Sequence, residues 1–89
     1  MFWERRRYRD SEQPLRAWFA EVRRAVWRTP QEVKAQYRSA SIGGNGRVIF
    51  NIGGNKYRLV AAVRYDLGIV FVRFVGTHKQ YDRIKVEEV

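Results

Sequence analysis

The segment RVIFNIGGNKYRLVAAVRYDLGIVFVRFV, residues 47–75, decides the fold of this chain. Apolar residues recur in it with a period of two, which is typical of β-strands. The triplets Gly-Gly-Asn at 53–55 and Asp-Leu-Gly at 66–68 interrupt the alternation, and they indicate tight turns because glycine and asparagine tolerate positive φ. We therefore expect an antiparallel meander, with Gly53 and Gly54 in its first turn. Its predicted strands are Arg47–Ile52, Lys56–Tyr65 and Ile69–Val75.

The sequence before this segment has the period of a helix. Five apolar residues recur at three- and four-residue steps and predict one amphipathic helix, with Asp10 or Ser11 as its cap. A second, shorter helix is predicted from Thr29, which caps it, with Pro30 in its first position and Glu32 completing a capping box. The tryptophans are expected to pack in or around the core rather than to stack on bases. The apolar stripe consists of Leu15, Trp18, Phe19, Val22 and Val26. The other two tryptophans are Trp3 and Trp27. In the second helix, Val33 and Tyr37 are expected to point inward.

These elements predict a single α+β domain over residues 1–89, with N-terminal helices packed on one face of a mainly antiparallel sheet of three to four strands. In the third strand Val70, Val72 and Phe74 are expected to face the helices, and Arg73 to face away. The opposite face carries cations and no acidic residue occurs on the three strands, so we interpret it as a phosphate-binding surface rather than an ordinary solvated face. Its cations are Arg47, Lys56, Arg58, Arg64 and Arg73.

Composition narrows the classes of partner and site. The chain carries 18 Lys and Arg against nine Asp and Glu, a formal charge of +9. This excess favours a polyanionic partner such as nucleic acid, an acidic membrane surface or an acidic protein. With no cysteine and one histidine, neither a thiolate site nor a zinc site of three or four ligands is expected, and no cofactor. No apolar run is long enough for a secretion signal or a membrane span, so a cytoplasmic location is expected.

The segment FVGTHKQYD, residues 74–82, holds the groups best suited to chemistry. Gly76 permits a sharp exit from the third strand, and Thr77 can cap a short helix that begins at His78. Cleaving RNA without a metal requires a base for the 2′-hydroxyl, an acid for the departing 5′-oxygen and cations on the phosphate. Histidine transfers protons near neutral pH, although a lone histidine near a strand end is more often structural.

The candidate catalytic residues are therefore a proton-transfer group, a residue that orients the nucleotide or shares the proton, and a cation for the developing phosphorane charge. Further cations are expected to bind the RNA phosphates, and Asp82 is interpreted as structural. His78 is the candidate for proton transfer, Tyr81 for orienting the nucleotide or sharing the proton, and Arg73 for the phosphorane charge. The phosphate-binding candidates are Lys56, Arg58, Lys79, Arg47 and Arg64.

The stretches FNIGGNKYRL at 50–59 and VGTHKQYD at 75–82 resemble the HigB-type toxins of bacterial type II toxin–antitoxin systems, which belong to the RelE/ParE-like superfamily. EQPLRAWFAEV at 12–22 and TPQEVKAQYRSASI at 29–42 are similar to the same family, so the resemblance covers nearly the whole chain. It implies a RelE/ParE-like fold and a ribosome-dependent mRNA endonuclease that arrests translation. It also implies a HigA-like antitoxin with a helix-turn-helix DNA-binding domain, through which the pair would bind its operator DNA.

The start of the chain departs from the family pattern. Members usually begin with a short strand, whereas this chain begins within the segment that resembles the family's first helix. The sheet is therefore expected to lack one strand and to expose an edge.

Two other functions fit the same residues. One is a basic RNA- or DNA-binding module without catalysis, which would use the same sheet face but would have no use for His78 and Tyr81. The other is a ParE-like toxin, which acts on DNA gyrase and lacks nuclease residues. Site-specific cuts in a translated mRNA would distinguish the nuclease from both.

Overall fold

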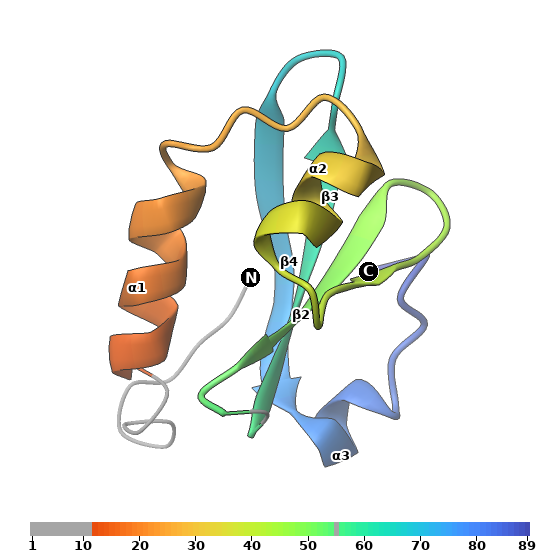
Figure 1. The fold of residues 1–89 in the computed structure, drawn as a ribbon. Coiled ribbons are helices and arrows are strands. Elements are labelled where there is room, and N and C mark those ends of the chain that lie inside the picture. Colours follow the sequence, from red (N-terminus) through yellow and green to blue (C-terminus); the bar gives the residue numbers. More distant parts are fainter. Residues whose placement is uncertain (1–11, 55) are drawn as a thin grey trace.

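A computed structural model describes residues 12–54 and 56–89 of the chain. Within these residues the chain forms two helices, a four-stranded antiparallel sheet in the order β1-β2-β3-β4, and a last short helix (Figure 1). The α+β prediction is confirmed, while Trp3 and the predicted caps Asp10 and Ser11 lie outside the described residues. The elements are α1 Glu12–Val22, α2 Pro30–Gln36, β1 Ser41–Ile42, β2 Arg47–Ile52, β3 Tyr57–Arg64, β4 Ile69–Thr77 and α3 His78–Tyr81.

The three predicted strands are present as a meander. β2 has the predicted bounds, β3 is one residue shorter at each end, and β4 continues two residues further, to Thr77. Gly53 and Gly54 occupy the turn between β2 and β3 with φ of +65° and +63°, as predicted. β1 pairs with β2 through only two residues, which is too short a segment to show any period in the sequence.

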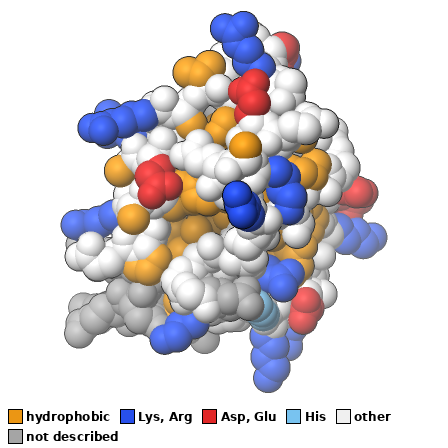
Figure 2. Space-filling model, viewed as in Figure 1, with side chains coloured by type: hydrophobic (Ala, Val, Ile, Leu, Met, Phe, Trp, Pro, Cys, Tyr) orange, Lys and Arg blue, Asp and Glu red, His pale blue; other side chains and the backbone are white. Residues whose placement is uncertain are grey.

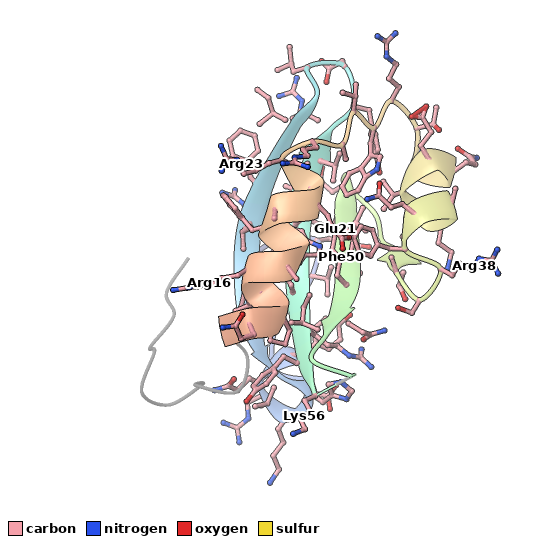
Figure 3. The ribbon with its side chains drawn as sticks, turned by 60° about the vertical axis from the view of Figure 1, so that its left-hand side comes forward. Arg16, Glu21, Arg23, Arg38, Phe50 and Lys56 are labelled. Carbon is pink, nitrogen blue, oxygen red and sulfur yellow. The ribbon has the colours of Figure 1, made fainter. Side chains whose placement is uncertain are left out.

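The hydrophobic core lies between the sheet and the two N-terminal helices, and Phe50 of β2 is at its centre. The Phe50 ring centroid lies 5.2 Å from that of Trp18 on α1, 6.0 Å from that of Trp27 and 5.2 Å from that of Tyr37, which follows α2. Figure 3 shows Phe50 pointing from the sheet into the space between α1 and α2. Trp18 and Trp27 are buried, so their predicted packing role is confirmed.

α1 buries fewer residues than its sequence pattern predicts. Leu15, Trp18 and Val22 contribute to the core, but Phe19 is 56% exposed and Val26 is 67% exposed. The helix ends at Val22, so Val26 lies in the irregular segment that follows it. Phe19 is about 100° around the helix from Trp18 and therefore lies at the rim of the core. The prediction that these two side chains are buried is wrong.

α2 begins as predicted, with one difference in its cap. Thr29 Oγ1 accepts a hydrogen bond from the backbone N–H of Glu32 at 3.4 Å, and Pro30 is in the first turn. The Glu32 carboxylate accepts from the backbone N–H of Arg28 at 3.2 Å, one residue before the cap, so the predicted capping box is displaced by one residue. Val33 is fully buried.

β4 contains a β-bulge that the alternation of the sequence does not reveal. Val60 pairs with Phe74, but the next residue of β3 pairs with Val72, so Arg73 is an extra residue without a partner in β3. The bulge turns Phe74 to the face opposite the helices and brings Val75 into the core. The prediction that Phe74 shares the helix-facing side with Val72 is therefore wrong.

A hydrogen bond from the Tyr37 hydroxyl to the Glu21 carboxylate joins the end of α2 to α1, and Figure 3 shows Glu21 on the side of α1 that faces α2. Burial, with this hydrogen bond and the charge of Glu21, raises the pKa of Tyr37 above its ordinary value of 10.0. Because the pKa of Tyr37 is higher in the folded than in the unfolded state, its contribution to stability is fully present below the unfolded-state pKa. This contribution is lost as pH rises through the folded-state pKa.

We therefore expect Tyr37→Phe to lower the free energy of unfolding by about 1 kcal/mol at pH 7, because one hydrogen bond is lost and packing is kept. The difference from the wild type should shrink above about pH 10, where the unfolded tyrosine ionises. Urea unfolding at pH 7, 9 and 10.5 measures this difference. A difference that stays constant up to pH 10.5 would rule out the ionisation effect.

Candidate functional site

α3 carries the two predicted proton-transfer groups and follows β4 without a loop. Thr77 Oγ1 accepts a hydrogen bond from the backbone N–H of Gln80 at 3.3 Å, and Gln80 Oε1 accepts one from the backbone N–H of Thr77 at 2.9 Å. This capping box confirms the predicted cap and the start of the helix at His78. Gln80 is not among the predicted residues, although the spacing Thr-x-x-Gln is the sequence signature of the motif.

Gly76 lets α3 fold closely against the end of the sheet. A Cβ atom on this residue would lie 2.6 Å from Gln80 Oε1 and 2.7 Å from Phe74 Cζ. The residue lies within β4, opposite Arg58 on β3, and is buried. Glycine is thus required here for space, because any side chain would push Gln80 or Phe74 away.

Two of the site residues predicted from the sequence, Arg58 and Tyr81, form a contact between a cation and an aromatic ring. The guanidinium carbon of Arg58 lies 4.6 Å from the centroid of the Tyr81 ring, within the range of a cation–π interaction. Both side chains are half-buried. The Arg58 Nε atom is buried and has no hydrogen-bond partner among the described residues. β3 therefore supplies a cation to a ring that α3 holds in place.

His78 is half-buried at the first position of α3. Its Nε2 atom is buried and has no hydrogen-bond partner within residues 12–54 and 56–89. A buried polar atom normally has a partner. The fold therefore leaves this imidazole nitrogen without a hydrogen bond from the described residues.

Two lysines complete the end of the molecule at which α3 lies. Lys56 precedes β3 and Lys79 is in α3, and both are exposed. Figure 3 shows Lys56 at that end of the sheet, and Figure 2 shows Lys and Arg side chains gathered there with an acidic side chain among them. We call this group the α3 site. It consists of Lys56, Arg58, His78, Lys79 and Tyr81.

Two cations of the predicted basic face lie elsewhere and have partners. Arg64 is six residues from Arg58 along β3, roughly 20 Å, and pairs with Asp66 of the next turn at 3.1 Å. The hydrogen bond from Arg64 lowers the pKa of Asp66. Arg47 donates to the backbone carbonyls of Asn45 at 3.1 Å and of Val89 at 2.6 Å. The strand register places Arg47, Arg58 and Arg64 on one sheet face, as predicted. Asp66 and main-chain oxygens nevertheless engage Arg47 and Arg64.

The C-terminal segment after α3 covers part of the same face. It runs from α3 to the loop before β2 (Figure 1), where the Asn45 side-chain amide donates to the carbonyl of Glu87 at 3.2 Å. Ile49 and Val60 are buried although they lie on the sheet face opposite α1 and α2. The sequence of residues 82–89 has no period that indicates such a crossing. The open part of the predicted basic face is therefore the end near α3.

Arg73 is exposed at the bulge of β4. It precedes His78 by five residues, which is roughly 16 Å along an extended strand. The structure brings Arg58 to Tyr81, but it places Arg73 further along the sheet. Arg73 is thus positioned for a different part of a long ligand than the α3 site itself.

The described residues contain no group of three or more His, Cys, Asp and Glu side chains that could hold a metal ion. In the same part of the chain no helix is long and apolar enough to cross a membrane. The α3 site offers an imidazole, a phenol and three cationic side chains, which come from α3, β3 and the turn before β3. Such a set can bind a phosphodiester and move a proton beside it.

Comparison with known proteins identifies the family. Residues 11–84 match the family described as HigB_toxin, RelE-like toxic component of a toxin-antitoxin system. The mRNA interferase toxin HigB of Escherichia coli strain K12 is 32% identical over 63 residues, which are 68% of this chain and 61% of that protein. The mRNA interferases HigB of Escherichia coli O157:H7 and of Shigella flexneri match with the same identity and coverage.

The chain spans about three-fifths of the length of these relatives. The family match, residues 11–84, includes all four strands of the sheet and all of the α3 site. The resemblance seen in the sequence is thereby confirmed, and the chain belongs to the HigB family of RelE-like toxins of toxin–antitoxin systems.

Proposed function

We propose that this chain is an mRNA endonuclease that cuts messages on translating ribosomes in the cytoplasm and so arrests translation. The observation that carries the proposal is the α3 site of this basic protein, where one short helix holds a histidine and a tyrosine. The histidine Nε2 has no hydrogen-bond partner among the described residues, and Arg58 lies over the tyrosine ring. The names of the three relatives, mRNA interferases, support it. We also infer that residues 1–89 act as one domain with a RelE/ParE-like fold.

The proposed reaction uses the RNA's own 2′-hydroxyl and no metal. The 2′-oxygen attacks phosphorus as a base takes its proton, the bond to the 5′-oxygen breaks, and an acid protonates that leaving oxygen. The products are a 2′,3′-cyclic phosphate and a 5′-hydroxyl. His78 performs one of the two proton transfers, and Tyr81 orients the nucleotide or shares the proton.

Different cations of the chain act on different phosphates of the RNA. Arg58, Lys56 and Lys79 act on the scissile phosphate and its neighbours, where they offset the charge that develops on the phosphorane. Arg73, further along β4, contacts a more distant phosphate and guides the RNA toward the α3 site. Arg47 and Arg64 contribute to the long-range positive field rather than to direct contacts.

Primer extension on a translated mRNA, after induced expression of the chain, tests the activity. New stops at discrete positions, with growth arrest, would support the nuclease. Growth arrest without new stops would favour a toxin with another target, as in the ParE-like branch. RNA binding without cleavage or growth arrest would favour a non-catalytic RNA-binding module.

The proposed protein partner is a HigA-like antitoxin with a helix-turn-helix DNA-binding domain, so that operator DNA is bound only through the complex. β4 lies at one end of the strand order and has no neighbour on its outer side among the described residues. Two exposed apolar side chains, Phe19 of α1 and Ile69 of β4, border a hollow of about 290 Å³ between α1 and β4. Leu67 in the turn before β4 and Phe71 in β4 are also exposed. A partner segment that adds a strand at this edge would bury part of these side chains.

We predict that the antitoxin raises the thermal stability of this chain, because a ligand that binds only the folded state shifts the unfolding equilibrium. At a partner concentration of about 100 Kd the gain is about 2.7 kcal/mol. A melting curve recorded with the neighbouring gene's product measures it. A melting temperature unchanged by a stoichiometric excess of that product would contradict the proposed partnership.

We predict that RNA affinity falls steeply with salt. Lys56, Arg58 and Lys79 together neutralise about three phosphates, which implies a slope near −2 in a plot of log affinity against log salt for a single strand. Fluorescence anisotropy with a labelled RNA between about 50 and 200 mM salt measures the slope. A flat response would mean that these cations are only solvated.

A further inference from the structure

The helix of the α3 site is too short to be stable by itself. α3 has four residues, and the few hydrogen bonds of such a helix do not offset the free energy of nucleation. The capping box of Thr77 and Gln80 fixes its first turn. At its other end the backbone N–H of Asp82 donates to the carbonyl of His78 at 2.9 Å. Whatever holds the C-terminal segment, residues 82–89, therefore also limits how far the end of α3 can move.

The C-terminal segment lies against the sheet through its apolar side chains. Ile84, Val86 and Val89 are half-buried, whereas the charged residues of the segment are exposed. On the sheet face that the segment crosses, Ile49 and Val60 are buried. Burial of apolar surface favours this contact but is non-directional. It does not by itself fix where along the sheet the segment ends.

Two polar contacts at the far end of the segment fix that position. The Asn45 side-chain amide donates to the carbonyl of Glu87 at 3.2 Å, and Arg47 Nη2 donates to the carbonyl of Val89 at 2.6 Å. Arg47 is the first residue of β2, and the loop before it is closed by a hydrogen bond from the Gly43 N–H to the Arg47 carbonyl at 2.8 Å. An ordered loop and a strand of the sheet thus hold the main chain of the segment.

We propose that Asn45 and Arg47 are positioning residues for the α3 site. They fasten the far end of the C-terminal segment to the sheet, and the segment restrains the last turn of α3, which carries Tyr81. Arg47 thus acts through the main chain of residues 87–89 rather than through a phosphate of the RNA. The inference goes beyond the proposed function, and only its consequence for cleavage rests on that function. The fastening itself is a property of the free protein and can be measured without RNA.

Hydrogen exchange at the backbone amides of residues 82–84 tests the fastening, because these amides donate to carbonyls of α3. Asn45→Gly removes the side-chain amide without changing the net charge, and glycine tolerates the φ of +57° at this position. It should speed exchange at these amides by roughly 3- to 10-fold, the effect of losing one hydrogen bond. Arg47→Gln should speed it by about 10-fold or more, because the lost donor is charged.

Arg64→Gln is the matched control for Arg47→Gln. It removes the same charge from β3, two residues beyond Ala62, which pairs with Arg47, but the ion pair of Arg64 is with Asp66. It should leave exchange at residues 82–84 within about 2-fold of the wild type. The amides of β3 report opening of the whole domain. Acceleration that is equal in β3 and in residues 82–84, or absent from both, would overturn the proposal.

A reversible disulfide can replace the lost contacts, since the chain has no cysteine of its own. A Cβ atom on Gly44 would lie 3.5 Å from Glu87 Cγ, whose place a cysteine Sγ would take. Gly44 is not among the residues with positive φ, so Gly44→Cys and Glu87→Cys can form a bridge after a small shift. When these changes are added to Asn45→Gly/Arg47→Gln, the oxidised form should exchange slowly at residues 82–84. The reduced form of the same sample should exchange fast.

Cleavage on ribosomes programmed with a defined mRNA relates the fastening to the α3 site. At saturating ribosome concentration the reduced form of this variant should cut about 10-fold more slowly than the wild type, because a small displacement of catalytic groups is costly. The form oxidised before the assay should regain most of the rate. Equal rates in the two forms would overturn the positioning role. A slower oxidised form would also overturn it, since the segment would then have to lift to admit RNA. If the variants exchange as predicted but the wild type never cuts mRNA, the nuclease is refuted and the fastening stands.

Discussion

His78→Gln is expected to slow mRNA cleavage by roughly 10²- to 10⁴-fold and to abolish growth arrest, because it removes a group that moves a proton in the transition state. Glutamine is similar in size and can still hydrogen-bond, but it does not titrate. The Nε2 atom of His78 has no hydrogen-bond partner among the described residues, so the substitution breaks no hydrogen bond between that nitrogen and them. Single-turnover cleavage on programmed ribosomes measures the rate.

The matched control for His78→Gln is Asp82→Asn, which alters a polar residue at the other end of α3 that is interpreted as structural. It should cleave near the wild-type rate. Both variants must show wild-type melting curves for the comparison to hold. If folded His78→Gln cleaves at the wild-type rate, the proton transfer belongs to Tyr81 or to the lysines of the α3 site.

Phe50→Ala is expected to lower the free energy of unfolding by about 3–5 kcal/mol, because it empties the centre of the core. Phe50 is 1% exposed and its ring contacts the rings of Trp18, Trp27 and Tyr37. In a domain of this size the loss should lower the melting temperature by about 12 °C or more.

Phe71→Ala removes the same side chain from β4, where Phe71 is 47% exposed, and is the control for Phe50→Ala. It should cost about 1 kcal/mol or less, since only part of the ring is removed from water. Urea unfolding of both variants compares the two sites. Similar losses at positions 50 and 71 would contradict the placement of the core on the helix side of the sheet.

The sequence predicts the local elements well because each has a local cause. The alternation over 47–52 sets β2, the pair Gly53-Gly54 sets the turn, and the Thr77 cap sets the start of α3. A period, a positive φ and a cap are all properties of neighbouring residues. The apolar face of α1 that buries Trp18 also follows from the spacing of residues that are close in the sequence.

What the sequence does not reveal depends on contacts between distant residues. The bulge at Arg73 is hidden because apolar residues flank it on both sides, so either register looks buried. Arg47 is engaged by the carbonyl of Val89, 42 positions away. The stacking of Arg58 on Tyr81 likewise joins β3 to α3. The residues of the α3 site could therefore be named from the sequence, but not which cation meets which ring.

The end groups of the cleaved RNA test the proposed chemistry most directly. A defined mRNA on programmed ribosomes is incubated with the chain, and the new termini are identified by their reactivity with polynucleotide kinase and by mass spectrometry. We predict a 2′,3′-cyclic phosphate and a 5′-hydroxyl, and loss of the cut when a 2′-deoxynucleotide replaces the nucleotide at the cleavage site. A 3′-hydroxyl with a 5′-phosphate would mean that water rather than the 2′-oxygen attacks, as in two-metal nucleases, and would contradict the proposed role of the α3 site.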